Sequence, residues 1–249
     1  MIDLTGKTIL LTGASRGIGA VTAKVLAKAG AQVVLHYGRS KAEAEAVAAE
    51  VGNCHLVQAD LAQPGAAQGL WREALEWRGR IDVLVNNAGI APYASVEDDL
   101  ETWSRAWGQT LQVNLVALAD LCREAIGHFR ARGGGIIVNV ASRAAFRGDN
   151  PNMMHYAASK GGVVALTKSI ARGFAHEKIL AYGLAPGWVE TEMAADYLRE
   201  HAADIARDIP IGSAAPPEDV AHTIAFLAAG LAPHMTGATL DINGASYVR

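Results

Sequence analysis

The chain has 249 residues, 51% of them hydrophobic, a length and composition suited to a single α/β domain over residues 1–249. Its 22 basic and 25 acidic side chains give a formal net charge of −3, which does not favour nucleic-acid binding. No apolar stretch reaches the roughly 18 residues that a membrane span needs, and the first residues lack a secretory signal pattern. We therefore expect a cytoplasmic protein with no nucleic-acid or membrane partner.

The chain contains two cysteines, Cys54 and Cys122. Each lies within an apolar segment, which predicts two buried free thiols in a reducing compartment. The eight histidines are scattered, without the ligand spacing of a zinc site, so we expect no metal.

Strand-like and helix-like segments alternate along the chain. Short apolar runs predict strands at 8–11, 32–36, 54–58, 81–85, 135–140, 179–184 and 238–242. Helical periodicity predicts helices at 20–29, 41–51, 65–77, 101–132, 155–175 and 217–229, with a break near Gly108. This alternation is typical of βαβ units and predicts a doubly wound parallel sheet (Rossmann fold) of about seven strands, with helices on both faces.

A glycine-rich turn separates the first predicted strand from the first predicted helix, with Gly13, Gly17 and Gly19 close together. A helix N-terminus presents unpaired N–H donors and a positive dipole, and glycine lets an anionic phosphate approach the backbone. The turn therefore predicts a dinucleotide diphosphate site. Its spacing differs from the commoner Gly-x-Gly-x-x-Gly, and a tight turn without a ligand is the alternative.

Polar or glycine-rich residues close almost every predicted strand. They are His36, Tyr37, Arg39 and Ser40 after the second strand, Asp60 and Leu61 after the third, Asn86, Asn87, Ala88 and Gly89 after the fourth, Ser142 after the fifth, and Pro186 and Gly187 after the sixth. Ligands of doubly wound sheets bind beyond these carboxyl ends. A purely structural domain does not need such polarity, so we predict a binding site along this edge.

Tyr156 and Lys160 are four residues apart, so they share one face of the helix predicted after Ser142. Alone, this pair is more often a surface aromatic beside a solvated lysine. Here it occurs in order with Thr12-Gly13-x-x-x-Gly17-Ile18-Gly19, Asn86-Asn87-Ala88-Gly89, Asn114, Ser142 and Pro186-Gly187. With this set, residues 5–245 resemble the classical type of the short-chain dehydrogenase/reductase family, and the 3-oxoacyl-[acyl-carrier-protein] reductases within it.

The resemblance implies that a nicotinamide cofactor reduces a ketone while Tyr156, the general acid, protonates the developing alkoxide. It also implies that Lys160 lowers the pKa of Tyr156 and bonds the nicotinamide ribose. Ser142 would hold the substrate oxygen, and Asn114 would support a water on a proton path. Taken alone, Asn114 is more often a helix kink or a satisfied buried amide, and Ser142 a strand-end cap.

No carboxylate ends the second predicted strand, where NAD-preferring relatives usually carry one for the ribose hydroxyl. Arg39 and Arg16 could pair with a 2′-phosphate instead, or be merely solvated. We therefore predict NADP(H), with NAD(H) less favoured. The predicted dinucleotide contacts are Gly13, Ser15, Arg16, Gly17, Ile18, Gly19, Tyr37, Arg39, Ser40, Asp60, Leu61, Asn87, Ala88, Gly89, Tyr156, Lys160, Pro186, Gly187, Val189 and Thr191.

The substrate pocket is expected among residues 91–94, 143–155 and the segment after Gly187, whose mixed polarity fits an apolar or mildly polar ketone. Gly133 and Glu177 stand where carrier-protein reductases are expected to have docking arginines, so a broad carbonyl reductase is an equal alternative. An alcohol or sugar dehydrogenase working in the oxidative direction and a non-catalytic cofactor-binding regulator are further alternatives. The resemblance also implies a homotetramer joined through the helices near 101–131 and 155–175 and the last strand.

Overall fold

The computed structural model describes residues 2–192 and 194–249. Within these ranges, seven parallel strands form one sheet in the order β3-β2-β1-β4-β5-β6-β7. The strands are β1 (Thr8–Leu11), β2 (Gln32–Tyr37), β3 (Cys54–Gln58), β4 (Val83–Asn86), β5 (Gly135–Val140), β6 (Ile179–Pro186) and β7 (Thr239–Ile242). The predicted doubly wound parallel sheet is therefore confirmed.

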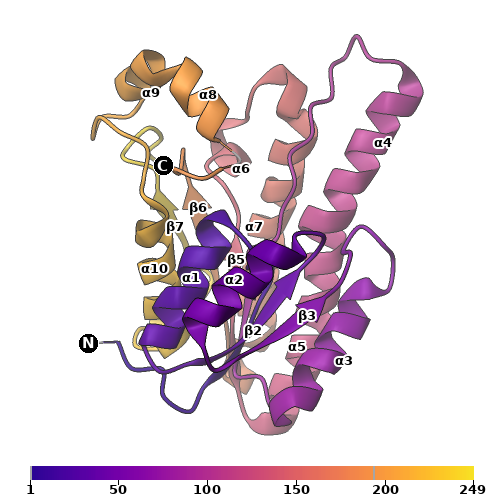
Figure 1. The fold of residues 1–249 in the computed structure, drawn as a ribbon, viewed down its shortest axis with the longest axis vertical. Helices are drawn as coiled ribbons and strands as arrows, with labels where there is room; N and C mark the ends of the chain where they lie inside the picture. Colours follow the sequence, from indigo (N-terminus) through magenta and orange to yellow (C-terminus); the bar gives the residue numbers. More distant parts are fainter. Residues whose placement is uncertain (1, 193) are drawn as a thin grey trace.

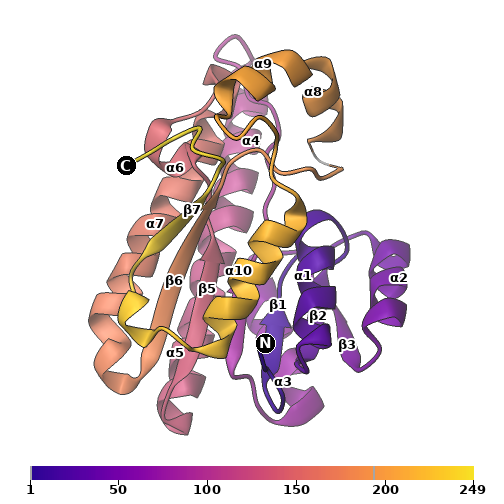
Figure 2. The same ribbon diagram turned by 90° about the vertical axis from the view of Figure 1, so that its left-hand side faces the viewer.

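Helices cover both faces of this sheet (Figures 1 and 2). They are α1 (Gly17–Lys28), α2 (Lys41–Val51), α3 (Ala66–Arg78), α4 (Leu100–Leu111), α5 (Ala117–Arg132), α6 (Ala144–Arg147), α7 (Met154–Phe174), α8 (Ala195–Glu200), α9 (Ala202–Asp208) and α10 (Pro217–Ala229). Figure 2 shows α1, α2 and α10 on one side and α4, α5 and α7 on the other. None of the helices in the described ranges has the length and apolar character needed to cross a bilayer.

Two apolar clusters bury the strands from opposite faces. Leu10 and Leu84 pack with side chains of α3, α5 and α7, whereas their neighbours Ile9 and Val83 pack with α1 and α10. Alternate residues of a strand point to opposite faces, so strands covered on both sides read as continuous apolar runs. Both cysteines are free thiols; Cys122 is buried, but Cys54 is only half-buried, contrary to the prediction.

The helix predicted over 101–132 is interrupted, but the break predicted near Gly108 is wrong. α4 runs through Gly108, and a π-helical turn at Gln112–Val116 separates α4 from α5. Asn114 lies in this turn, accepts a 2.8 Å hydrogen bond from the Ile90 N–H and donates one of 2.9 Å to the Ile90 carbonyl. These tertiary bonds favour the wider turn, which is common at functional sites.

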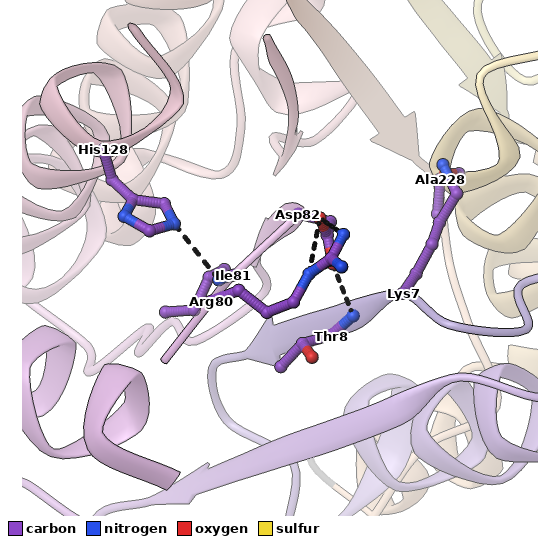
Figure 3. A network of polar contacts seen from close by, with 7 residues as sticks. All are labelled: Lys7, Thr8, Arg80, Ile81, Asp82, His128 and Ala228. Atoms are coloured by element: carbon purple, nitrogen blue, oxygen red, sulfur yellow. Dashed lines mark hydrogen bonds and ion pairs between the residues drawn. The ribbon is translucent and has the colours of Figure 1, made fainter. Parts of the chain in front are cut away.

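A polar network closes the amino ends of β1 and β4, away from the glycine turn (Figure 3). Asp82 accepts a 2.8 Å hydrogen bond from the Thr8 N–H, and its own N–H donates to the Thr8 carbonyl at 2.8 Å. Arg80 forms an ion pair with the same carboxylate. The Ile81 N–H donates to His128 Nε2 at 3.2 Å. The network therefore joins the start of the two central strands.

Replacing Asp82 by Ala should lower the free energy of unfolding by about 1–3 kcal/mol, because it leaves a buried N–H without its acceptor. Urea unfolding measures this loss. Asp82→Asn retains an acceptor oxygen and should lose less. A wild-type unfolding midpoint for Asp82→Ala would show that the network does not stabilise the sheet.

Candidate active site

The glycine turn brings β1 close to the loop that follows β4. Gly13 has a φ of +66°, and a Cβ there would lie 2.9 Å from the Ala88 Cα. A Cβ at Gly19 would lie 1.9 Å from the Gly13 carbonyl oxygen, so neither position accepts a larger residue without a backbone shift. The N-terminus of α1 has no side-chain cap, which leaves donors of its first turn for an anion. This cradle fits a diphosphate.

Hydrogen bonds fix the loop after β4 against this turn. The Thr12 hydroxyl accepts 3.0 Å hydrogen bonds from the N–H groups of Asn87 and Ala88. The Asn87 amide donates to the carbonyls of Thr12 and Gly13 at 2.9 and 3.0 Å. The predicted contacts from the first and fourth strands therefore form one continuous surface.

Asn114 and Lys160 converge on Gly89 from different helices. A Cβ at Gly89 would lie 3.4 Å from Asn114 Oδ1 and 3.5 Å from Lys160 Nζ. Lys160 is 3% exposed and donates a 2.8 Å hydrogen bond to the Val140 carbonyl. Burial lowers its pKa to about 8. The ammonium is thus held at the end of β5, one turn from Tyr156.

Tyr156 lies near both Lys160 and Ser142. The Lys160 Nζ is 5.7 Å from the centroid of the Tyr156 ring. Burial raises the pKa of Tyr156; a hydrogen bond with Ser142 opposes this shift and the charge of Asp149 reinforces it. The lowered pKa expected for this tyrosine is therefore not found, because burial of the phenol has the larger effect. The phenol is protonated at neutral pH, the form that a general acid requires.

The residues predicted for the adenosine end lie after β2 and β3. Tyr37 and Leu61 are buried, and Ser40 is the N-cap of α2. The side chain of Arg39 is 89% exposed, and its guanidinium lies 3.8 Å from the carboxylate of Asp60. Arg39 is therefore an extended surface cation held only by a weak ion pair, free to turn toward a ligand.

The segment after β6 returns to the glycine turn. Pro186 ends β6, the Gly187 N–H donates to Ile242, and Val189 pairs with Ala215. A groove between this segment and α1 and α2 is lined by Ser15, Arg16, Gly17, Ala20, Val21, Glu43, Ala46, Val47, Glu190, Thr191, Glu192 and Pro217. A Cβ at Gly17 would lie 3.3 Å from the Thr191 side chain. Thr191 and the predicted phosphate turn are thus neighbours.

Arg143, directly after Ser142, joins three segments near the expected substrate pocket. It is 5% exposed, donates to Asp208 at the end of α9 at 3.2 Å, and also bonds the hydroxyl of Ser246. Its guanidinium lies 5.8 Å from the centroid of the Trp188 ring. Figure 1 shows α6, α8, α9 and the C-terminus together at this end of the molecule.

The C-terminal residues also pack on α6, which follows Ser142. Tyr247 stacks on Phe146 with 6.5 Å between ring centroids, and the Arg249 guanidinium lies 3.9 Å above the same ring. Tyr247 and Arg249 therefore cover part of α6, which lies within the segment 143–155 expected to border the substrate pocket.

One residue of this region, His36, is absent from the contacts predicted for the dinucleotide. It is 2% exposed, and its ring contacts both Gly13 and Ala59. The one signal in the sequence is a histidine at the end of an otherwise apolar strand. Among residues 2–192 and 194–249, no three His, Cys, Asp or Glu side chains are grouped in a way that would hold a metal ion.

Comparison with known proteins agrees with this geometry. A family profile described as enoyl-(acyl carrier protein) reductase matches residues 13–245. A 3-oxoacyl-[acyl-carrier-protein] reductase from Synechocystis is 36% identical, over 98% of each chain. A short-chain type dehydrogenase/reductase from Mycobacterium marinum superposes with a TM-score of 0.89 at 30% identity, over 100% of this chain and 98% of that one. A 3-ketoacyl-(acyl-carrier-protein) reductase from Brucella melitensis, complexed with NADH, superposes with a TM-score of 0.87 at 36% identity. The match covers 99% of this chain and 100% of that one.

These matches cover nearly the whole chain at 30–36% identity. The chain belongs to the short-chain dehydrogenase/reductase family, as its motifs predict. It is an oxidoreductase of the class that acts on CH–OH groups.

Proposed function

We propose that the chain is an NADP(H)-dependent carbonyl reductase that converts a ketone into an alcohol, with Tyr156 as the general acid. The observation that carries this proposal is the convergence of Asn114 and Lys160 on Gly89, beside Tyr156 and next to the glycine turn. A regulator that only senses the dinucleotide needs the turn but has no use for a buried lysine one turn from a half-buried phenol.

When bound, the nicotinamide supplies the hydride. The proposed contacts of the dinucleotide are the uncapped first turn of α1 for the diphosphate, the 87–89 loop for the nicotinamide side, and Lys160 for the ribose hydroxyls. Val189 and Thr191 would contact the carboxamide. These roles use N–H donors and a cation where the ligand carries acceptors.

The protein's own part of the reaction is to orient the substrate and supply a proton. Ser142 would hold the substrate oxygen near the Tyr156 hydroxyl, which donates its proton as the alkoxide forms. Asn114 would hold a water that returns a proton by way of Lys160. The pKa of Tyr156 is raised, so the phenol is protonated at neutral pH, as the proton donor of a reduction must be.

The substrate is proposed to be a 3-oxoacyl thioester or another small carbonyl compound. Two of the relatives named above, from Synechocystis and Brucella melitensis, are named as 3-oxoacyl- or 3-ketoacyl-(acyl-carrier-protein) reductases. In this chain Arg130 forms an ion pair with Glu177, with 2.8 Å between Nη2 and Oε1. This pair reduces the positive charge that an acidic carrier protein could contact, and therefore favours a free small molecule. Oxidation of NADPH, followed by its loss of absorbance over a panel of ketones and oxoacyl thioesters, tests the proposal; no turnover with any member would contradict it.

We also propose a homotetramer in the cytoplasm. Val116 and Met154, on the two helical regions expected to form the interface, are 45% and 39% exposed. The small side chains of Ala158 and Ala165 are exposed on α7 and would permit close helix packing. Gly162 packs inside the same chain and not at this interface, because a Cβ there would lie 2.7 Å from the Leu115 side chain. Light scattering tests the assembly.

Arg39→Ala should weaken NADPH binding by about tenfold, the equivalent of about 1.4 kcal/mol, through loss of one contact with the 2′-phosphate. NADH lacks that phosphate, so its Kd should stay the same in the variant and serves as the internal control. Fluorescence titration with both cofactors measures the two constants. Comparable wild-type affinities for NADH and NADPH would contradict the proposed preference for NADP(H); the Brucella melitensis structure holds NADH.

A further inference from the structure

His36 lies near the end of β2, directly below the glycine turn, and its two ring nitrogens have different partners. Nδ1 accepts a 3.1 Å hydrogen bond from the Gly13 N–H, and Nε2 lies 2.9 Å from the Ala59 carbonyl oxygen. A nitrogen that accepts from an N–H carries no proton, so Nε2 must be the protonated nitrogen and must donate to Ala59. The two contacts fix one neutral tautomer.

The neutral form is stable at physiological pH. Burial lowers the pKa of His36 to about 4, although the hydrogen bond to Ala59 acts in the opposite direction. An imidazolium would present an N–H to the Gly13 N–H and lose that bond. At physiological pH the His36 ring is therefore neutral, and in this form it connects Gly13 to Ala59.

This connector joins two parts of the predicted dinucleotide site. On one side is Gly13, whose φ of +66° no side chain of its own can stabilise. On the other side is Ala59, the residue before Asp60 at the predicted adenosine end. The main chain reinforces the connection, since the Ala14 N–H donates to the His36 carbonyl at 2.8 Å and the Ala59 N–H donates to the Tyr37 carbonyl at 3.1 Å.

We propose that His36 is a positioning residue for the dinucleotide, which holds the glycine turn and the end of β3 in one arrangement before the cofactor binds. The proposal rests on the proposed function. At 2% exposure the ring does not itself face a ligand, so it acts through Gly13 and Ala59. A turn ordered in advance loses less conformational freedom on binding, which raises affinity.

The test compares His36→Leu with His128→Leu. His128 is a matched control because its Nε2 accepts a 3.2 Å hydrogen bond from the Ile81 N–H, at the opposite end of the sheet (Figure 3). Each variant removes one imidazole acceptor from a backbone N–H. We expect the NADPH Kd of His36→Leu to rise about tenfold or more, and that of His128→Leu to change less than twofold. The KM for NADPH should follow the Kd, while kcat at saturating cofactor stays within about threefold of wild type.

His36→Gln covers the case in which the leucine variant fails to fold, because an amide carries both an acceptor and a donor. It should recover part of the lost affinity. In His36→Leu the Gly13 amide loses its acceptor and should exchange with solvent faster than in wild type, which a purely global loss of stability would not produce selectively. His36→Gln should restore part of this protection. An unchanged Kd in both His36 variants, or an equal loss in His128→Leu, would overturn the inference. If the wild-type chain bound neither NADPH nor NADH, the proposed function itself would fail first.

Discussion

Tyr156→Phe should lower kcat for ketone reduction by about 10²–10⁴-fold, the range that a positioned general acid supplies. The variant keeps the aromatic ring beside Lys160 and removes only the hydroxyl, so the glycine turn and the 87–89 loop are untouched. Because these cofactor-binding segments are unchanged, the Kd for NADPH should stay within about twofold of wild type. Steady-state kinetics and fluorescence titration on one preparation give both values.

Tyr182→Phe is the matched control for this experiment. Tyr182 lies on β6, whereas Tyr156 lies on α7. Tyr182 is 1% exposed, and its hydroxyl donates to the Ala232 carbonyl at 3.2 Å. Loss of this hydroxyl should cost stability but leave kcat near the wild-type value. Equal kcat losses in the two variants, or full activity of Tyr156→Phe, would remove Tyr156 from the mechanism.

The second large effect concerns Lys160 and pH. Burial lowers the pKa of Lys160 to about 8, so the ammonium is present below that pH and is lost as the pH rises through it. The protonated form is the stronger donor to ribose hydroxyls, and NADPH affinity should therefore fall on the alkaline side of pH 8. Tyr156, with its raised pKa, titrates later, so this fall should also be present in Tyr156→Phe.

Lys160→Met should bind NADPH about 10–100-fold more weakly at neutral pH, the equivalent of losing one hydrogen bond from a charged group. Its affinity should show no fall near pH 8. Lys168→Met, an exposed lysine two turns further along α7, is the control and should retain the wild-type profile. A fall that persists unchanged in Lys160→Met would assign the titration to another group.

Much of the fold can be predicted because its determinants are local. Residues such as Ile9 and Leu10 are buried on opposite faces of the sheet. A strand buried on both faces is a continuous apolar run, which can be recognised in the sequence without knowing which strands it pairs with. The π-helical turn cannot be predicted in this way, because it depends on bonds between Asn114 and Ile90, which are 24 residues apart. The periodicity of apolar residues in a helix does not indicate a hydrogen bond to a distant loop.

For the candidate site, the identity of the residues can be predicted from the sequence, whereas their ionisation cannot. Its members can be identified from motifs and from their places at strand ends, and the structure brings Asn114, Lys160 and Gly89 together. Ionisation is different, since the pKa of Tyr156 depends on how deeply the phenol is buried, which spacing along a helix does not specify. His36 can be placed at the binding edge from its position at a strand end, but its role cannot be predicted, because it depends on two backbone contacts, with Gly13 and Ala59, each 23 residues away.

The packing of the last residues on α6 has a practical consequence. Because Ser246 bonds Arg143, and Tyr247 stacks on Phe146, residues 246 and 247 help to shape the surroundings of Ser142. A purification tag fused after Arg249 would lie beside these contacts, so turnover should be compared with and without such a tag. Tags belong at the other terminus, and a mass-spectrometric check for carboxypeptidase trimming should accompany every kinetic comparison.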